Sequence, residues 1–341
     1  MIKGIKSNDC HAEPVEASEK IKMENSLRII YMGTPEFAVA PLQQLVEQKC
    51  NVVAVITAVD KPAGRGQKLN FSAVKEYALT QNIPILQPES LKNETFLEEL
   101  ASYKADLQIV VAFRMLPKVV WDMPVKGTFN LHASLLPQYR GAAPINWAII
   151  NGDKETGVTT FFIEEQIDTG NIIFQEKVAI LPEDTIGTLY EKLMSIGSNM
   201  VIKTVRAIEA NGIKPIPQAE IPIENLKPAP KINKETCKID WNCDAEIIHN
   251  LVRGFSPYPA AWTELFLHDE KSTIKIFSTT VDNTSHVLTP GTIITDSKHY
   301  LKVACGKGSI NITDLQPAGK KRMDAVSFLN GHKIKDEEKF N

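Results

Sequence analysis

The segment Leu107–Ala112, LQIVVA, is an almost unbroken apolar run, and Leu27–Met32, LRIIYM, repeats the pattern near the start of the chain. Runs of this length, rich in β-branched residues, are typical of strands that are buried on both faces of a parallel sheet. Segments with the apolar spacing of helices lie between them, such as Pro35–Glu47, which has proline in its first turn. Because strands and helices alternate, the sequence predicts a Rossmann-like, doubly wound α/β domain with a parallel sheet.

The same alternation extends to about residue 212, so we expect the first domain to span residues 27–212. Further strands are predicted at Val52–Ala58, Pro84–Gln87, Thr128–His132, Val158–Glu164 and Ile172–Ile180. Further helices are predicted at Ser72–Thr80, at Leu91–Tyr103 and over a long apolar face from Leu189 to Ile208 that stops at Asn211-Gly212.

The two ends of this domain have different compositions. Residues 1–26 are polar and lack the apolar core of a signal peptide, so we interpret them as a disordered extension. At the other end, five prolines fall within the 17 positions 214–230, which indicates an extended, stiff linker at 213–232. Beyond it, five short strand-like segments follow one another closely. This spacing is typical of a small β-barrel, such as the OB type, and we expect that domain at 233–335.

The overall composition excludes several classes of protein. The chain has 341 residues, of which 43% are hydrophobic and 23% charged, and its net charge is −3, as in an ordinary globular protein and unlike a general polyanion binder. The longest apolar stretch, Val52–Val59, is too short to cross a membrane. Five scattered cysteines without a C-x-x-C pair argue against a zinc site and favour a reducing, cytoplasmic compartment.

The densest group of candidate functional residues is Asn130–Gly141, NLHASLLPQYRG. Asn130 and His132 alternate along one predicted strand, so their side chains point to the same face. Open α/β sheets bind ligands at the carboxyl ends of their strands, and an amide and an imidazole there can bind an oxyanion and move a proton. An isolated histidine, by contrast, is more often a core residue that a neighbouring carbonyl satisfies.

A second candidate is Gln166–Gly170, QIDTG, which lies between two predicted strands and places Asp168 on a loop. Such an aspartate commonly makes only local backbone hydrogen bonds. Beside an asparagine and a histidine, however, its carboxylate can hold an imidazolium in place. The turn Gly33-Thr34-Pro35 after the first strand has one glycine where a dinucleotide site has three, so NAD is not expected.

Taken together, NLHASLLPQYRGAAP at 130–144 and IDTG at 167–170 resemble the folate-dependent formyltransferase family. Three further segments are similar to the members of that family that act on methionyl-tRNA: DKPAGRGQKL at 60–69, IDW at 239–241 and LQPAGKK at 315–321. The resemblance covers nearly all of residues 27–330. It implies transfer of a formyl group from 10-formyltetrahydrofolate to the α-amino group of initiator methionyl-tRNA, without a metal. We also expect a monomer that does not associate with a membrane.

The resemblance also assigns roles to individual residues. It makes Asn130, His132 and Asp168 the catalytic set. It places the reduced folate against Phe113, Arg114, Met115 and Leu116 and against Ser134, Leu135, Leu136 and Pro137. It assigns tRNA contacts to Lys61, Arg65, Lys68, Lys320 and Lys321. The chain departs from the family at Phe113-Arg114, where a Tyr-Gly pair is usual, and arginine cannot adopt all the backbone conformations of glycine.

These residue types suit a single displacement. Attack of the amine on the formyl carbon creates an oxyanion, to which the Asn130 amide and a protonated His132 can donate, while Asp168 keeps the imidazole charged and oriented. No nucleophilic serine or cysteine is needed. The insert 61–75 carries Lys61, Arg65, Lys68 and Lys75 and no acidic residue, which suits a loop that follows phosphates. The second domain is neutral, with 14 Lys/Arg and 14 Asp/Glu from 233 to 341.

Two other interpretations remain open at this point. A formyltransferase that acts on a small amine, such as glycinamide ribonucleotide or an amino sugar, would share the same three catalytic side chains but would not need the basic insert. A non-catalytic RNA-binding protein with the same fold would not need those side chains, and all three are intact. Comparing formylation of tRNA, methionine and glycinamide ribonucleotide would separate the three interpretations.

Overall fold

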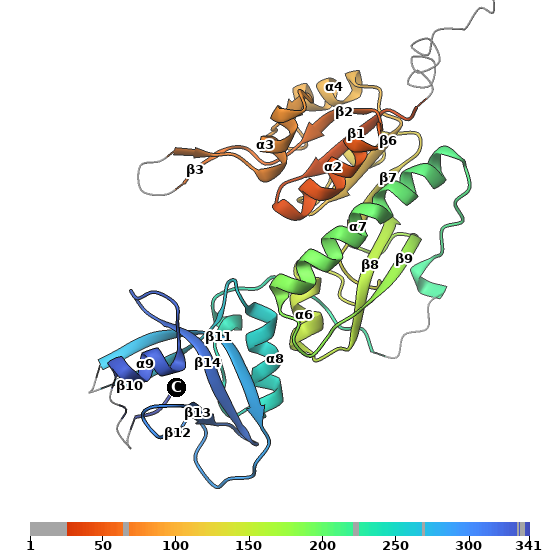
Figure 1. Ribbon diagram of the computed structural model, residues 1–341. Helices are drawn as coiled ribbons and strands as arrows, with labels where there is room; N and C mark the ends of the chain where they lie inside the picture. The colour runs from red at the N-terminus through yellow and green to blue at the C-terminus, as the bar shows by residue number, and fades with distance from the viewer. Residues whose placement is uncertain (1–25, 64–67, 221–224, 268–269, 333, 335–337) are drawn as a thin grey trace, which may run out of the picture.

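The structure is a computed structural model that describes residues 26–63, 68–220, 225–267, 270–332, 334 and 338–341 (Figure 1). The predicted extension at 1–26 therefore lies outside the described residues except for Ser26. The described residues build a seven-stranded sheet in the first half of the chain, a six-stranded sheet in the second half and a separate two-stranded hairpin, and a long α7 helix runs beside the first sheet (Figure 1). None of the described helices is long and apolar enough to cross a membrane.

The first sheet has seven strands in the order β5-β2-β1-β6-β7-β8-β9. Their bounds are β1 (Ile29–Gly33), β2 (Val52–Ile56), β5 (Ile85–Leu86), β6 (Leu107–Val111), β7 (Thr128–His132), β8 (Glu155–Phe162) and β9 (Ile172–Ala179). The first five are parallel, whereas β8 and β9 are antiparallel to their neighbours. The expectation of a parallel sheet is therefore wrong for β8 and β9, because a short connection such as 163–171 cannot make a parallel crossover. The predicted Rossmann-like α/β class is confirmed.

Strand β1 shows why these segments are continuously apolar. Ile29 and Tyr31 enter one core together with α2 and α7, whereas Ile30 and Met32 enter the core on the opposite face. Every position of the strand is buried, so each must be apolar. Helices cover both faces: α2 (Val39–Glu47), α3 (Ala73–Thr80), α4 (Glu94–Ser102), α5 (Lys118–Trp121), α6 (Pro144–Ile150) and α7 (Ile186–Glu209).

The second sheet is antiparallel, in the order β10-β11-β14-β13-β12, with β15 paired to β14. The strands are β10 (Ala261–Leu267), β11 (Glu270–Asp282), β12 (Ile293–Thr295), β13 (Leu301–Ala304), β14 (Ser309–Pro317) and β15 (Met323–Asp324). The end of the chain joins both edges, since Phe340 bridges Leu265 of β10 and Lys339 bridges Thr292 beside β12. The sheet thus closes on itself through the tail, in agreement with the predicted small β-barrel.

Two helices in this half, α8 (Ala245–Phe255) and α9 (Ala325–Gly331), are not among the predicted elements. Helix α8 buries Ile248, Val252 and Phe255 in the barrel core, so its helical spacing was present in the sequence. Its other side packs on α6, where the Asn146 amide donates to the Gly254 carbonyl at 2.7 Å (Figure 1). This contact brings the barrel against the first domain beside the carboxyl ends of β6 and β7.

Candidate active site

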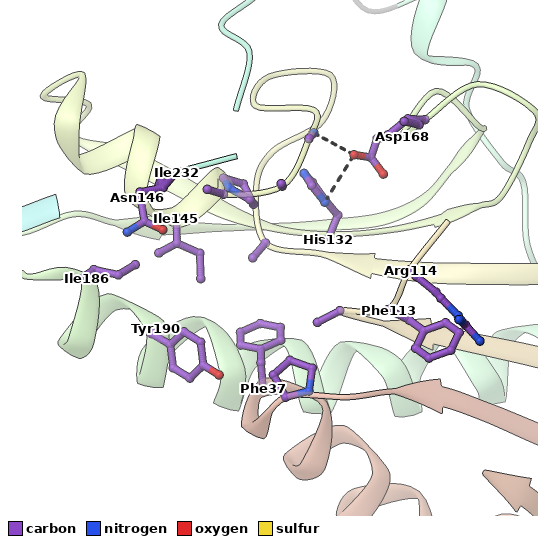
Figure 2. A pocket seen from close by; sticks show the side chains of 18 of the residues that line it. Phe37, Phe113, Arg114, His132, Ile145, Asn146, Asp168, Ile186, Tyr190 and Ile232 are labelled. Carbon is purple, nitrogen blue, oxygen red and sulfur yellow. Dashed lines mark hydrogen bonds and ion pairs between the residues drawn. The ribbon is translucent and has the colours of Figure 1, made fainter. Parts of the chain in front are cut away.

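A cavity of about 1280 Å³ opens at the carboxyl ends of β6 and β7 and extends to the barrel (Figure 2). Asn130, His132 and Asp168, predicted from separate segments, all line it. Figure 2 shows His132 between two groups of side chains, with Phe113 and Arg114 on one side and Phe37, Ile145, Ile186 and Tyr190 on the other. The structure thus brings the three predicted catalytic residues together in one cleft.

The hydrogen bond of His132 determines which ring nitrogen is available for chemistry. His132 Nε2 lies 2.9 Å from the carbonyl oxygen of Tyr139. Because a carbonyl can only accept, Nε2 carries a proton. In the neutral imidazole Nδ1 is then the acceptor, and this atom lies 4.0 Å from Asp168 Oδ2. The ring is 7% exposed, like that of a core histidine. Its Nε2 atom is occupied by the hydrogen bond to Tyr139, whereas its Nδ1 atom is available for chemistry.

Asp168 lies on the loop between β8 and β9, and its carboxylate is tied to the segment that follows His132. Its Oδ2 atom accepts a hydrogen bond from the Gly141 backbone N–H at 2.9 Å, and the same oxygen faces His132 (Figure 2). The carboxylate therefore makes more than the local backbone contacts of an ordinary turn. Its position places a negative charge beside the imidazole, as the sequence pattern predicts.

Four non-glycine residues around this cavity have left-handed backbone conformations that are uncommon outside glycine: Ala112 (φ +47°), Tyr139 (φ +60°), Asp168 (φ +54°) and Ala260 (φ +74°). Strained residues of this kind concentrate at functional sites, where surrounding contacts hold them. The Tyr139 hydroxyl donates to Asp153 at 2.6 Å, and burial raises the pKa of this side chain well above its usual value. The anchored ring fixes the backbone carbonyl that accepts the hydrogen bond from His132 Nε2.

Asn130 and His132 point to the same side of β7, two residues apart. The Asn130 side chain is half-buried, and it makes no hydrogen bond to the part of the chain that the structure describes. Its amide N–H groups are therefore available to a ligand in the cavity.

The residues of the segment Phe113–Leu116 all line the cavity. Among the described residues, these four make no backbone–backbone hydrogen bond, so their N–H and C=O groups are available. The Arg114 guanidinium turns outward and donates to the carbonyls of Glu89 (2.9 Å) and Pro88 (2.5 Å). Since the left-handed residue is Ala112, Arg114 does not occupy a position that requires glycine.

Ser134, Leu135, Leu136 and Pro137 do not line this cavity. The Ser134 hydroxyl donates to the Gln138 carbonyl at 2.7 Å, and Leu136, 2% exposed, packs with Phe161 and Ile172. These residues form a buried turn between His132 and Tyr139. A role in folate binding would therefore act through the positions of those two residues.

The basic insert forms a hairpin of β3 (Lys61–Ala63) and β4 (Lys68–Asn70), which pair antiparallel and project away from the sheet (Figure 1). Lys61 is exposed, whereas Arg65 lies outside the described residues. Lys75 is not one of the free cations of the insert, because it belongs to α3 and pairs with Asp60 and Gln87.

In the barrel, Lys320 and Lys321 are exposed on the turn between β14 and β15. The neighbouring Arg322 pairs with Asp314 at 2.6 Å, so its charge is already paired within the chain. The turn lies near the cavity, because the Ala318 N–H donates to the carbonyl of Thr273, a lining residue.

The sequence did not reveal the barrel's part of the cavity wall. This wall includes Lys234, Tyr258, Trp262 and Lys275, and Tyr258 is 80% exposed between two prolines. Lys234 Nζ lies 5.1 Å from the Trp262 ring centroid, a cation–π distance. An exposed tyrosine in the Ser-Pro-Tyr-Pro stretch was the available signal. Among the described residues, no group of His, Cys, Asp and Glu side chains is arranged to hold a metal.

Comparisons with known proteins identify the class. The formyl transferase family matches residues 27–205, and the formyl transferase C-terminal domain matches residues 231–333. The chain therefore belongs to the formyl transferase family, as the sequence motifs indicated.

Its curated relatives are more specific. The chain is 56% identical over 320 residues to the methionyl-tRNA formyltransferase of Phocaeicola vulgatus, covering 93% of this chain and 99% of that protein. It is 54% identical over 320 residues to the enzyme of the same name from Bacteroides thetaiotaomicron, with the same coverage. It is 53% identical over 313 residues to that of Flavobacterium johnsoniae, covering 92% of this chain and 98% of that protein.

Solved structures share the fold. The sugar 3N-formyltransferase WlaRD, studied with dTDP and 5-N-formyl-THF, superimposes with a TM-score of 0.61 at 25% identity, covering 86% of this chain and 99% of that chain. An N-formyltransferase from Helicobacter canadensis in complex with folinic acid and dTDP-3-aminofucose gives a TM-score of 0.63 at 24% identity, covering 87% of this chain and all of that chain. Solved formyltransferases of this fold thus hold a reduced folate.

Proposed function

We propose that this chain transfers the formyl group of 10-formyltetrahydrofolate to the α-amino group of initiator methionyl-tRNA. The observation that carries the proposal is the arrangement of His132 Nδ1, Asp168 and the free Asn130 amide in one cavity. Identity above 50% with curated methionyl-tRNA formyltransferases, over about nine tenths of the chain, supports tRNA rather than a small amine as acceptor.

The residues at one side of the cavity fit a reduced folate. A pterin ring presents alternating hydrogen-bond donors and acceptors along its edge, and the unpaired backbone groups of Phe113–Leu116 match such an edge. Phe113 and Leu116 supply apolar surface beside them. When bound, the folate supplies a formyl group on nitrogen, which is the carbon that the amine attacks.

The geometry gives each catalytic side chain a role. As the amine nitrogen attacks, it becomes positively charged, and His132 Nδ1 accepts its proton because Nε2 is already protonated toward Tyr139. Asp168, 4.0 Å away, stabilises the imidazolium. Asn130 donates to the formyl oxygen as negative charge develops there. His132 then returns the proton to the folate nitrogen as the old C–N bond breaks.

This assignment differs in one respect from the expectation based on sequence. That expectation had a protonated His132 donate to the oxyanion, whereas the orientation of the ring supports the proposal that His132 is the base for the amine in the first half of the reaction. In this assignment the Asn130 amide donates the hydrogen bond to the oxyanion, and backbone N–H groups of the cavity are further donors.

The other side of the cavity fits the aminoacyl group. Phe37 and Tyr190 lie edge to face, with ring centroids 5.2 Å apart, and Ile145, Ile186 and Ile232 complete a largely apolar surface (Figure 2). A methionine side chain suits this surface, because thioether sulfur packs well against aromatic rings. A sugar in place of the methionine side chain would set polar hydroxyl groups against this apolar surface. The cations Lys234 and Lys275 in the barrel wall suit the phosphates of a tRNA acceptor end.

We further expect the enzyme to act as a monomer in the cytoplasm, where its thiols stay reduced. Cys50, Cys237, Cys243 and Cys305 are free, as expected for that compartment.

The test is a comparison of acceptors. The purified chain is mixed with 10-formyltetrahydrofolate and, in separate reactions, initiator methionyl-tRNA, free methionine, glycinamide ribonucleotide or a dTDP-amino sugar. We expect rapid formylation of methionyl-tRNA alone. Formylation of a small amine at a higher kcat/KM than methionyl-tRNA would overturn the proposal.

A further inference from the structure

We propose that the linker between the two domains is a working part of the active centre, and that Gln218 is a positioning residue that holds the Asp168 loop in its catalytic conformation. This inference rests on the proposed function and deepens it. The five prolines of the linker predict only a stiff spacer, and nothing in their pattern indicates that Gln218 is buried.

Gln218 lies in the short 3-10 turn η2 (Gln218–Glu220) and is 3% exposed. Its amide nitrogen donates to two carbonyls of the catalytic loop, those of Asp168 (2.9 Å) and Gly170 (2.8 Å). Its amide oxygen accepts from Arg140 Nε (3.1 Å) and Nη2 (2.6 Å). One side chain therefore joins the linker, the Asp168 loop and the segment that follows His132.

The two hydrogen bonds that Gln218 donates reach a part of the backbone with an uncommon conformation. Asp168 has φ +54°, a left-handed backbone conformation that a residue with a side chain seldom adopts. The Gln218 amide donates hydrogen bonds to the carbonyl of Asp168 itself and to that of Gly170, two residues further along the chain. Without these bonds the loop can relax to a commoner conformation, which would carry the carboxylate away from His132.

A second stretch of the linker holds the other half of the centre. The Tyr139 N–H donates to the Lys227 carbonyl at 2.7 Å, and the Ala229 N–H donates to the Arg140 carbonyl at 2.9 Å. Gly141 lies so close to this stretch that a β-carbon there would be 2.5 Å from the Ala229 oxygen. The linker thus packs directly on the backbone that carries the partners of His132 and Asp168.

These contacts connect His132, Asp168 and the linker to one another. The His132 ring is oriented by the carbonyl of Tyr139, the Asp168 carboxylate is oriented by the N–H of Gly141, and the linker bonds to both segments. Catalysis depends on such orientation steeply, since a displacement of 1 Å can cost about 100-fold in rate. Gln218 is the member of this set that touches Asp168 through its side chain, so substitution can test it.

The experiment compares two substitutions of nearly equal volume. Gln218→Met keeps the buried volume and removes every hydrogen bond of the amide, whereas Gln218→Glu retains an acceptor for Arg140 and removes the donors to the Asp168 loop. We expect both variants to lose about 10- to 100-fold in kcat with methionyl-tRNA. The KM values for tRNA and folate should change less than about threefold. Gln81→Ala, at an exposed end of α3, is the control and should retain normal kinetics.

A double-mutant cycle separates positioning of Asp168 from general damage. In an Asp168→Asn background, Gln218→Glu should cost less than about threefold in kcat, because the charge that Gln218 positions is already gone. Equal losses in both backgrounds, or normal kcat in the folded Gln218 variants, would overturn the inference. Failure of the unmodified chain to formylate methionyl-tRNA would instead overturn the proposed function. Circular dichroism and thermal unfolding show whether each variant is folded. If Gln218→Met does not fold, the kinetics of Gln218→Glu, the closer isostere, decide the test.

Discussion

The candidate active centre and the β3–β4 hairpin are built in different ways. In the centre, His132 and Asp168 are each oriented by a backbone atom, and a third segment braces those atoms. The hairpin arms pair with each other, and near the base Asp60 is held by Lys75 and Gln87. The difference shows what each task requires. Proton transfer needs groups placed within a fraction of an ångström, whereas attraction of phosphates acts over several ångströms and tolerates movement.

The largest effect should come from removing the base of the centre. We expect His132→Ala to lower kcat with methionyl-tRNA by about 10³-fold, and Asn130→Ala by about 10²-fold, because each removes one contact to the reacting atoms. Single-turnover kinetics would measure this loss. His299→Ala, on an exposed turn of the barrel, is the matched control. Near-normal kcat in a folded His132→Ala protein would show that the centre lies elsewhere.

The buried turn behind the centre should affect stability more than ligand affinity. Leu136 is 2% exposed among Phe161 and Ile172, so Leu136→Ala should lower the free energy of unfolding by about 2–4 kcal/mol. Denaturant titration measures this, and calorimetry on the folded variant should find folate affinity within about twofold of normal, in keeping with the absence of Leu136 from the cavity wall. Leu79→Ala, an exposed position, is the control. A large loss of folate affinity without loss of stability would show that Leu136 contacts the folate.

The insert should act on tRNA binding alone. We expect Arg65→Ala to raise KM for methionyl-tRNA about tenfold at low salt and to leave kcat at saturating tRNA nearly unchanged, because its guanidinium contributes phosphate contacts. The difference from the unmodified protein should shrink as salt is raised. A fall in kcat at saturating tRNA would instead place the insert within the catalytic geometry and remove the contrast with the centre.

The smallest effect should come from the base of the hairpin. The hydrogen bond from Lys75 holds the pKa of Asp60 below its usual range, so Asp60 stays ionised next to β3. Lys75→Met should raise that pKa toward its ordinary value and raise KM for tRNA about threefold, as expected for a partly exposed ion pair. Lys177→Met, which breaks a pair with Glu155 elsewhere on the sheet, should leave KM unchanged. Equal effects of the two substitutions would mean that Lys75 has no special role in orienting the hairpin.

The sequence predicted most of the elements of the first domain because their signals are local. Strand β7 begins and ends at the predicted residues, and α7 ends at Glu209, with Ala210 as its C-cap just before the predicted stop at Asn211-Gly212. The direction of β8 and β9 was not predicted, because the apolar pattern of a buried strand is the same in parallel and antiparallel pairs. The wall that the barrel contributes was not predicted either, because it depends on how α8 packs against α6.

The sequence by itself determined the fold class and indicated the candidate catalytic side chains. The nearly continuous apolar runs of β1 and β6, in which every position is buried, require a sheet covered on both faces, and the two-residue spacing of Asn130 and His132 places them on one side of a strand. Only the tertiary structure decided which nitrogen of His132 faces Asp168 and which residue braces that aspartate. The Tyr139 carbonyl and the Gly141 N–H are backbone groups that every such residue carries, so no residue type marks them. Gln218 meets Asp168 across 50 residues of chain, a contact that no local pattern encodes.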